Sequence, residues 1–205
     1  MRVADYVVKF IVEELKVKHI FGVTGAGIMH LTDGVACNSN ITWVALHDER
    51  SCAMAADAYS RASENFGVCM VSTGPAATNA ITGVAGAWQD SVPMLVISGQ
   101  VARDQMRTGG CRQGGVQELT VIPMVSYITK YAETVYEPEM ILQQLQQAVY
   151  LATSGRPGPV WLEIPMDVQA AEVPAYLESF EYYPVKLAPS KESLHEIESL
   201  FLRAS

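Results

Sequence analysis

The chain has 205 residues, 49% of them hydrophobic and 18% charged, which is typical of a folded domain with its own core. Its formal net charge of -8 argues against nucleic-acid binding, because phosphate contacts need clustered Lys and Arg. The sequence contains no run of about 18 apolar residues, so no membrane span is expected. The four irregularly spaced cysteines indicate neither a zinc site nor a disulfide framework. We therefore expect a cytoplasmic protein with reduced cysteines that binds neither nucleic acid nor membrane.

Short apolar runs alternate with segments of helical periodicity along most of the chain. The predicted strands are 19–23, 41–46, 67–72, 93–98, 130–135 and 160–165, with 41–46 read as buried, and the predicted helices are 3–16, 28–37, 51–61, 78–88, 119–125 and 138–153. Apolar strands that alternate with helices are typical of a parallel sheet covered on both faces. The predicted fold class is α/β, a three-layer α/β/α structure with a mainly parallel six-stranded sheet.

Two segments break this alternation. Residues 99–116 are polar and Gly-rich without periodicity, which predicts a long, functional loop. Residues 173–189 contain Pro and Tyr without alternation, which predicts an extended linker, and Ser190 is expected to cap a new helix. We accordingly expect one domain over 1–172, a linker over 173–189, and over 190–205 the first helix of a following, truncated domain.

Glu49 stands between the run 41–46 and the helical pattern 51–61, where a strand turns into its helix. In α/β sheets ligands bind at the carboxyl ends of the strands. A carboxyl group there can share a proton with a bound heterocycle if apolar walls favour its protonated form. The alternative is a carboxylate that only stabilises the amino end of a helix.

Three further segments lie at the ends of predicted strands, namely 22–27, 72–79 and 90–100. Because the carboxyl ends of parallel strands meet at one edge, we expect all of these turns to form one rim with Glu49. The pattern Gly25-x-Gly27-x-x-His30 also approaches the dinucleotide-binding fingerprint. Its third glycine is replaced by His30, so a Rossmann-type dinucleotide-binding domain is kept as an alternative.

Together these motifs resemble the N-terminal, pyrimidine-binding domain of thiamine-diphosphate-dependent enzymes of the acetolactate synthase, pyruvate oxidase and benzoylformate decarboxylase family. The resemblance runs from about Val3 to Val173 and is closest to the acetolactate synthase branch. The segments that carry it are GVTGAG (22–27), HDERSCAMAADAYSR (47–61), STGPAATNAITGVAGAWQDSVPMLVISGQV (72–101) and VQELTVIPMVSYITKY (116–131). It implies an enzyme that decarboxylates a 2-keto acid and/or ligates the resulting carbanion.

The resemblance also implies roles for individual residues. Glu49 corresponds to the essential glutamate that hydrogen-bonds N1' of the cofactor's aminopyrimidine. The residues implied to contact the cofactor are Thr24, Gly25, Thr73, Gly74, Pro75 and Asn79, and those implied to face the substrate are Gln113 and Gln117. No metal ligand is expected within the chain itself.

Two positions depart from the family pattern. The chain has Gly74-Pro75-Ala76 where the family often has Gly-Pro-Gly, and Asp48-Glu49-Arg50 where it often has His-Glu-Gln. A guanidinium turned toward Glu49 would favour the ionised carboxylate and oppose proton sharing. We therefore expect Arg50 to turn away from Glu49.

The resemblance implies cofactors and partners that extend beyond these residues. Thiamine diphosphate is the expected cofactor, with Mg²⁺ held by a second domain whose Gly-Asp-Gly motif this chain lacks; whether FAD is bound in the full-length protein stays open. A homo-oligomer formed through the pyrimidine-binding domain is expected, and the fragment alone should be inactive. Two alternatives remain: one subunit of a two-chain 2-keto acid decarboxylase, and a non-catalytic regulatory or assembly relative.

Overall fold

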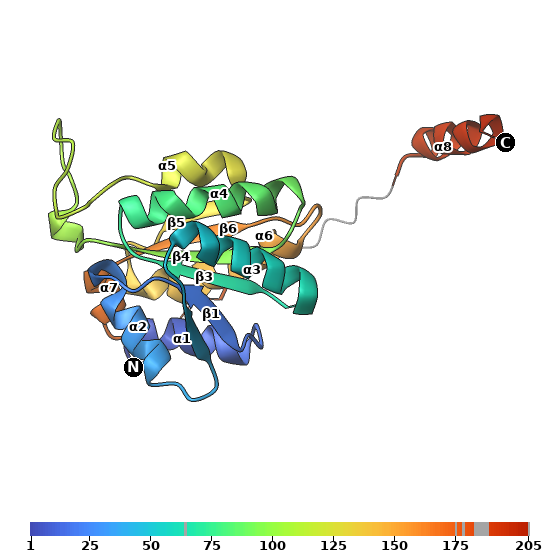
Figure 1. Ribbon diagram of the computed structural model, residues 1–205. Coiled ribbons are helices and arrows are strands. Elements are labelled where there is room, and N and C mark those ends of the chain that lie inside the picture. Colours follow the sequence, from blue (N-terminus) through green and yellow to red (C-terminus); the bar gives the residue numbers. More distant parts are fainter. Residues whose placement is uncertain (64, 175, 178, 183–188, 205) are drawn as a thin grey trace.

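The computed structural model describes residues 1–205 except 64, 175, 178, 183–188 and 205 (Figure 1). Six strands form one sheet in the order β2-β1-β3-β4-β6-β5, and each neighbouring pair is parallel. The strands are β1 (His19–Gly22), β2 (Thr42–Ala45), β3 (Gly67–Val71), β4 (Met94–Gln100), β5 (Tyr131–Thr134) and β6 (Val160–Pro165). The predicted six-stranded α/β sheet is thereby confirmed.

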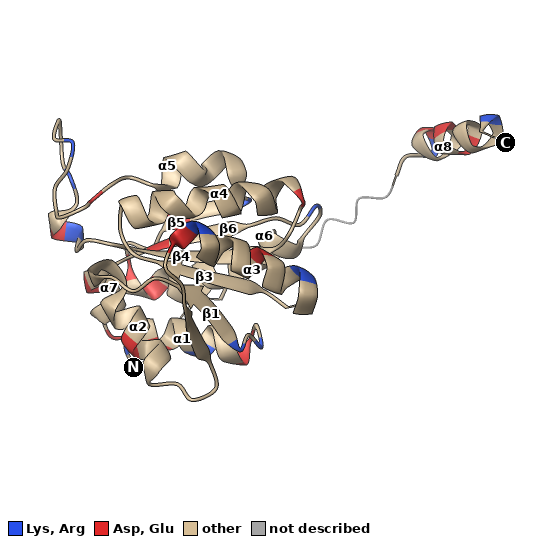
Figure 2. Ribbon diagram, viewed as in Figure 1, with Lys and Arg blue, Asp and Glu red and all other residues tan. Residues whose placement is uncertain are grey.

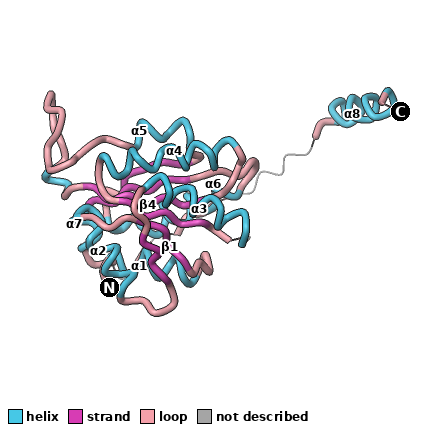
Figure 3. Tube along the Cα trace, viewed as in Figure 1, coloured by secondary structure: helices cyan, strands magenta, loops and turns pink. Residues whose placement is uncertain are grey.

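Helices cover both faces of the sheet, and the magenta strands of Figure 3 lie between the two helical layers. One core joins the sheet to α1 (Val3–Glu13), α2 (Met29–Ala36), α6 (Ile141–Thr153) and α7 (Met166–Ala170), and the other joins it to α3 (Glu49–Ser63), α4 (Pro75–Gln89) and α5 (Ile122–Val125). Strand β3 is buried along its whole length because Val68 and Met70 pack into the first core and Cys69 and Val71 into the second. Short 3-10 turns complete the domain at η1 (Ala26–Ile28), η2 (Arg103–Gln105), η3 (Ser126–Ile128) and η4 (Pro138–Met140).

Helices α3 and α4 lie unusually close together at Gly83. A Cβ atom added there would come within 2.5 Å of the Ala53 Cβ and 2.8 Å of the Met54 backbone nitrogen. Small residues at such a contact let two helix backbones approach each other. This close contact fixes the two helices whose amino ends reach the same edge of the sheet.

The prediction of a buried strand at 41–46 is wrong in part. Strand β2 forms, but Thr42 and Ala45 are exposed and Trp43 and Val44 only partly buried. It is an edge strand that pairs with β1 alone, so neither of its faces is fully covered. An apolar run cannot by itself distinguish an edge strand from a central one.

Several element ends also differ from the prediction. Strand β4 continues through Gly99 and Gln100, both buried, where the long loop was expected to begin. Helix α4 begins at Pro75 rather than at 78, because proline suits the first turn of a helix. Helix α3 begins at Glu49 itself, and α7 was not predicted.

The chain beyond α7 was expected to be a linker followed by a helix. In the part of it that the structure describes, the Phe180 backbone N–H donates to Gln146 Oε1 over 2.8 Å, and Tyr182 stacks on Tyr150 of α6. Residues 175, 178 and 183–188 of the expected linker, and Ser205, lie outside the described residues. Helix α8 (Lys191–Arg203) follows, with Ser190 accepting from the Ser193 N–H, and none of its described residues is buried.

The strand order creates a crevice between β1 and β3. From β1 the chain moves outward to β2 and then returns to place β3 on the other side of β1. Connections that leave two neighbouring strands in opposite directions open a crevice at the carboxyl ends of those strands, which is where ligands bind in doubly wound sheets. The order differs from the β3-β2-β1-β4-β5-β6 arrangement of the Rossmann fold.

Candidate active site

A cavity of about 680 Å³ opens at this crevice. It is lined by the turn after β1, the start of α3, the turn after β3, the first turns of α4, and one residue of the long loop. The lining residues are Thr24, Gly25, Ala26, Glu49, Ser72, Pro75, Ala76, Thr78, Asn79 and Gln117. The predicted rim consisted of the Glu49 junction and the segments 22–27, 72–79 and 90–100. The first three of these four therefore meet at the cavity.

The fourth predicted segment, 90–100, does not line the cavity. Its last residue, Gln100, is fully buried, and its Nε2 donates to the Leu119 backbone oxygen over 2.9 Å. Gln100 thus anchors the backbone just after the long loop through a buried hydrogen bond.

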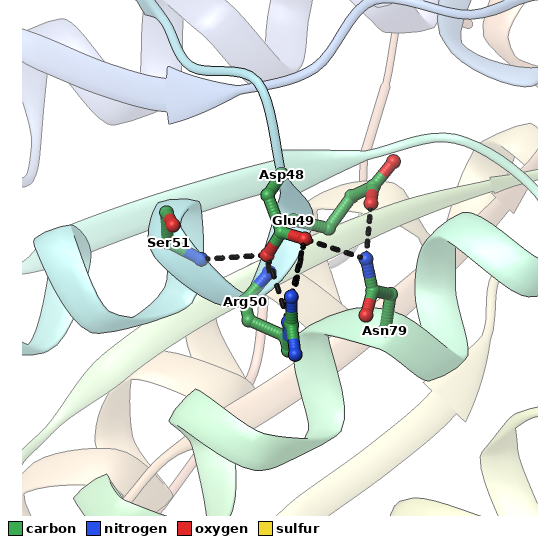
Figure 4. A network of polar contacts seen from close by, with 5 residues as sticks. All are labelled: Asp48, Glu49, Arg50, Ser51 and Asn79. Carbon is green, nitrogen blue, oxygen red and sulfur yellow. Dashed lines mark hydrogen bonds and ion pairs between the residues drawn. The ribbon is translucent and has the colours of Figure 1, made fainter.

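Glu49 is the first residue of α3 and is half-buried in the cavity wall. Its Oε2 accepts a hydrogen bond of 2.7 Å from Nδ2 of Asn79, which lies in the second turn of α4 (Figure 4). The carboxylate of α3 and the amide of α4 are brought together because both helices begin at the same edge of the sheet. Glu49 and Asn79, which the sequence places in two separate motifs, are thus hydrogen-bonded to each other.

Asp48 and Arg50 form an ion pair beside Glu49. Arg50 Nε lies 3.0 Å from Asp48 Oδ1 and Nη2 lies 2.9 Å from Oδ2, a bidentate arrangement (Figure 4). Figure 2 shows red and blue ribbon side by side at the start of α3, where acidic and basic residues follow one another in the sequence. The hydrogen bond from Arg50 lowers the pKa of Asp48 to about 2, so Asp48 is ionised throughout the neutral range. As expected, Arg50 turns away from Glu49, with 57% of its side chain exposed.

Glycines let the turn after β1 pack directly on the turn after β3. The Gly27 N–H donates to Ser72 Oγ over 3.2 Å, and a Cβ atom on Gly25 would come within 2.4 Å of that oxygen. A Cβ atom on Gly27 would approach Thr73 Oγ1 to 1.9 Å. Thr73, predicted to contact a cofactor, is 4% exposed and lies behind the cavity wall rather than among its lining residues.

Gly74 supports Gln117 at the mouth of the cavity. Gly74 has φ +61°, and a Cβ atom there would meet the Gln117 backbone oxygen at 1.9 Å. Gln117 itself has φ +59°, a conformation that non-glycine residues rarely adopt and that costs about 1–3 kcal/mol. The close contact with Gly74 accompanies this strained conformation and places Gln117 in the cavity wall.

Gln113 lies elsewhere. It lines a separate hollow of about 440 Å³ formed within the loop 104–116, and its Nε2 donates to the Gly115 backbone oxygen over 2.8 Å. The two glutamines predicted to face the substrate are therefore not brought together. Sequence reasoning also missed four lining residues, Ala26, Ser72, Ala76 and Thr78, although each is adjacent to a selected residue in the quoted motifs.

The part of the chain that the structure describes holds no group of three or more His, Cys, Asp or Glu side chains arranged to bind a metal. None of its helices combines the length and the apolar character that crossing a membrane requires.

The strand order and the cavity define a class: a doubly wound α/β protein that binds its ligand at the switch point, with one carboxyl group in the cavity wall. A family model described as "Thiamine pyrophosphate enzyme, N-terminal TPP binding domain" matches residues 1–124. The chain belongs to this family, and the match implies thiamine diphosphate as cofactor.

The chain is also similar to curated acetolactate synthase large subunits. The chain is 36% identical over 165 residues to the acetolactate synthase large subunit of Buchnera aphidicola and to the acetolactate synthase isozyme 3 large subunit of Escherichia coli, covering 80% of the chain and 28% of each relative. It is 34% identical over 194 residues to the probable acetolactate synthase large subunit of Methanocaldococcus jannaschii, covering 95% of the chain and 30% of the relative. The chain thus matches less than a third of the length of these relatives.

Proposed function

We propose that this chain is the pyrimidine-binding domain of an acetolactate synthase-like enzyme, which decarboxylates a 2-keto acid and/or joins the product to an acceptor. The observation that carries the proposal is Glu49, half-buried at the switch point between β1 and β3 and hydrogen-bonded to Asn79. The identity of 33–38% to acetolactate synthase large subunits supports the reaction class.

The cavity suits a flat heterocycle. Its lining combines small apolar residues, Gly25, Ala26, Pro75 and Ala76, with five polar residues and the single carboxyl group of Glu49. Glycine at position 25 allows the backbone to approach a ring closely. The residues present therefore fit the aminopyrimidine of thiamine diphosphate.

When bound, thiamine diphosphate supplies an electron sink at C2 of its thiazolium ring. Glu49 would hold the aminopyrimidine at N1' through its carboxyl group and would share a proton with it there. Gln117, which lines the same cavity, would be the residue that contacts the 2-keto acid. We assign Mg²⁺ and the diphosphate to a second domain, supplied by another subunit of a homo-oligomer.

The substitution Glu49→Gln tests this proposal. It keeps the shape of the side chain and its contact with Asn79 but removes the exchangeable carboxyl proton. In the complete enzyme, we expect the rate of C2 proton exchange on bound thiamine diphosphate, measured by NMR, to fall by at least about 100-fold. The melting temperature should change little.

Glu14→Gln is the matched control, because Glu14 is exposed and lies outside the cavity. It should leave proton exchange unchanged. Normal exchange in the Glu49→Gln enzyme would refute the proposed role of Glu49 and with it the enzymatic function.

A further inference from the structure

Asn79 donates to two neighbouring carboxylates at once. Its Nδ2 lies 2.7 Å from Glu49 Oε2 and 3.4 Å from Asp48 Oδ2. A side-chain amide nitrogen carries two hydrogens, so it can serve both acceptors. Figure 4 shows this amide between the two carboxyl groups, at the point where α3 and α4 approach each other.

The chemistry of the two neighbours fixes the orientation of the amide. Ionised Asp48 accepts hydrogen bonds and donates none, so the NH₂ group must face it and the amide oxygen must point away. Rotating the amide by a half-turn would place its oxygen against the Asp48 carboxylate and would remove the donor from Glu49 Oε2. One conformation of Asn79 is therefore strongly preferred.

Asp48 is held independently of Asn79. Its Oδ1 accepts from the backbone N–H groups of Arg50, over 2.9 Å, and Ser51, over 3.3 Å, as expected of the residue that caps a helix. The Arg50 guanidinium binds both of its oxygens. Asp48 is thus a fixed acceptor that orients one hydrogen of the Asn79 amide and leaves the other for Glu49.

We infer that Asn79 is a positioning residue that holds Glu49 through Oε2, so that Oε1 is the oxygen that faces the bound aminopyrimidine. This inference rests on the proposed function. Among the described residues, no hydrogen bond to Glu49 Oε1 is found, whereas Oε2 is occupied. Asp48 and Arg50 stand where the family often has His and Gln. This pair fixes the Asn79 amide, which in turn determines which of the two Glu49 carboxyl oxygens is left free.

This role differs from direct binding of the cofactor. If Asn79 mainly bound the ring, its removal would weaken cofactor affinity. If it positions Glu49, its removal leaves affinity nearly unchanged and slows proton transfer, because the carboxyl group loses its fixed orientation. Misplacing a catalytic group by about 1 Å can cost on the order of 100-fold in rate.

The first test uses NMR of this chain without cofactor. The two Asn79 side-chain amide protons should give separate, slowly exchanging signals. Glu49→Gln should shift mainly one of them and Asp48→Asn mainly the other, since asparagine also caps helices well and preserves α3. The inference would be overturned if these protons exchanged with water as fast as those of a free amide, or if neither substitution changed their chemical shifts.

The second test uses the complete enzyme. Asn79→Ala should slow C2 proton exchange by about tenfold or more and change the Kd for thiamine diphosphate less than about threefold. Combined with Glu49→Gln, it should cause no further loss of exchange, since the two residues act as one unit. Asn40→Ala, at an exposed asparagine remote from the cavity, is the control and should change neither quantity.

The outcomes distinguish the proposed function of Glu49 from the positioning role of Asn79. Normal exchange in Glu49→Gln refutes the proposed function. A strong loss in Glu49→Gln with normal exchange in Asn79→Ala refutes only the positioning role. Additive losses in the double variant, or a large rise in Kd for Asn79→Ala, also refute that role and make Asn79 a binding residue.

Discussion

Glu163 is a buried carboxyl group outside the cavity. Glu163 lies on β6 and is only 2% exposed. Its Oε2 accepts a hydrogen bond of 3.0 Å from Thr134 Oγ1. Its Oε1 has no hydrogen-bond partner among the described residues. Burial raises the pKa of Glu163 to about 7, against the Thr134 hydrogen bond, which lowers it. The folded chain therefore binds this proton more tightly than the unfolded chain, whose ordinary value is 4.5.

This residue predicts a pH-dependent stability. Because the folded pKa is raised, the contribution of Glu163 is complete below pH 4.5 and is lost as the pH rises to about 7. Glu163→Gln should remove this loss, so that denaturant unfolding shows a variant more stable than the natural chain at about pH 8, by at most about 3 kcal/mol. Glu133→Gln, at an exposed position of β5, is the control; an equal effect of both substitutions would contradict the prediction.

At the scale of single elements, α4 contains a matched pair of glycines. Gly74 precedes its first turn with φ +61° against Gln117, whereas Gly86 lies in its last turns with nothing within 4 Å of an added Cβ atom. Gly74→Ala should destabilise the chain by about 2 kcal/mol or more, because alanine rarely adopts this conformation and its Cβ atom clashes. Gly86→Ala should stabilise it by up to about 1 kcal/mol through helix propensity.

Urea unfolding of the two variants measures this difference. Opposite signs are expected for the same chemical change in one helix. If Gly74→Ala were as stable as the natural chain, the close contact between Gly74 and Gln117 would be wrong.

The elements themselves were largely predictable from the sequence, and their ends were not. Apolar runs gave all six strands, but β2 was expected to be buried because a run of residues does not show whether a strand has one neighbour or two. Gly99 was assigned to the long loop because it opens a polar, Gly-rich segment without periodicity. In the structure Gly99 is required within β4, since a Cβ atom there would meet the Gly27 backbone oxygen at 1.9 Å.

The site was predictable to the extent that parallel strands bring their ends together. Glu49, Gly25, Pro75 and Asn79 meet for that reason. The positions of Thr73 behind the wall and of Gln113 in a separate hollow depend on the packing of two turns and on the path of a long loop. Those tertiary details leave no periodic pattern in the sequence.

At the scale of the whole molecule, the site residues come from one domain that matches 28% of the length of two relatives. In the proposed function the cavity of this chain holds the aminopyrimidine, and the described part of the chain has no cluster of metal ligands for a magnesium-bound diphosphate. We therefore expect isothermal titration calorimetry on this chain to show weak binding of thiamine diphosphate that Mg²⁺ does not strengthen. Tight, magnesium-dependent binding would contradict the division of labour between two domains.

The contact between α3 and α4 has a consequence for the acid itself. Ala53 follows Glu49 by four residues and Gly83 follows Asn79 by four, so each lies one helical turn below its partner on the same helix face. The distance between the carboxyl group and the amide thus depends on how closely the two helix backbones approach each other at Gly83, which is not among the residues that line the cavity. A side chain at position 83 would push the two helices apart and separate the two groups, so Gly83 helps to set the hydrogen bond between Glu49 and Asn79.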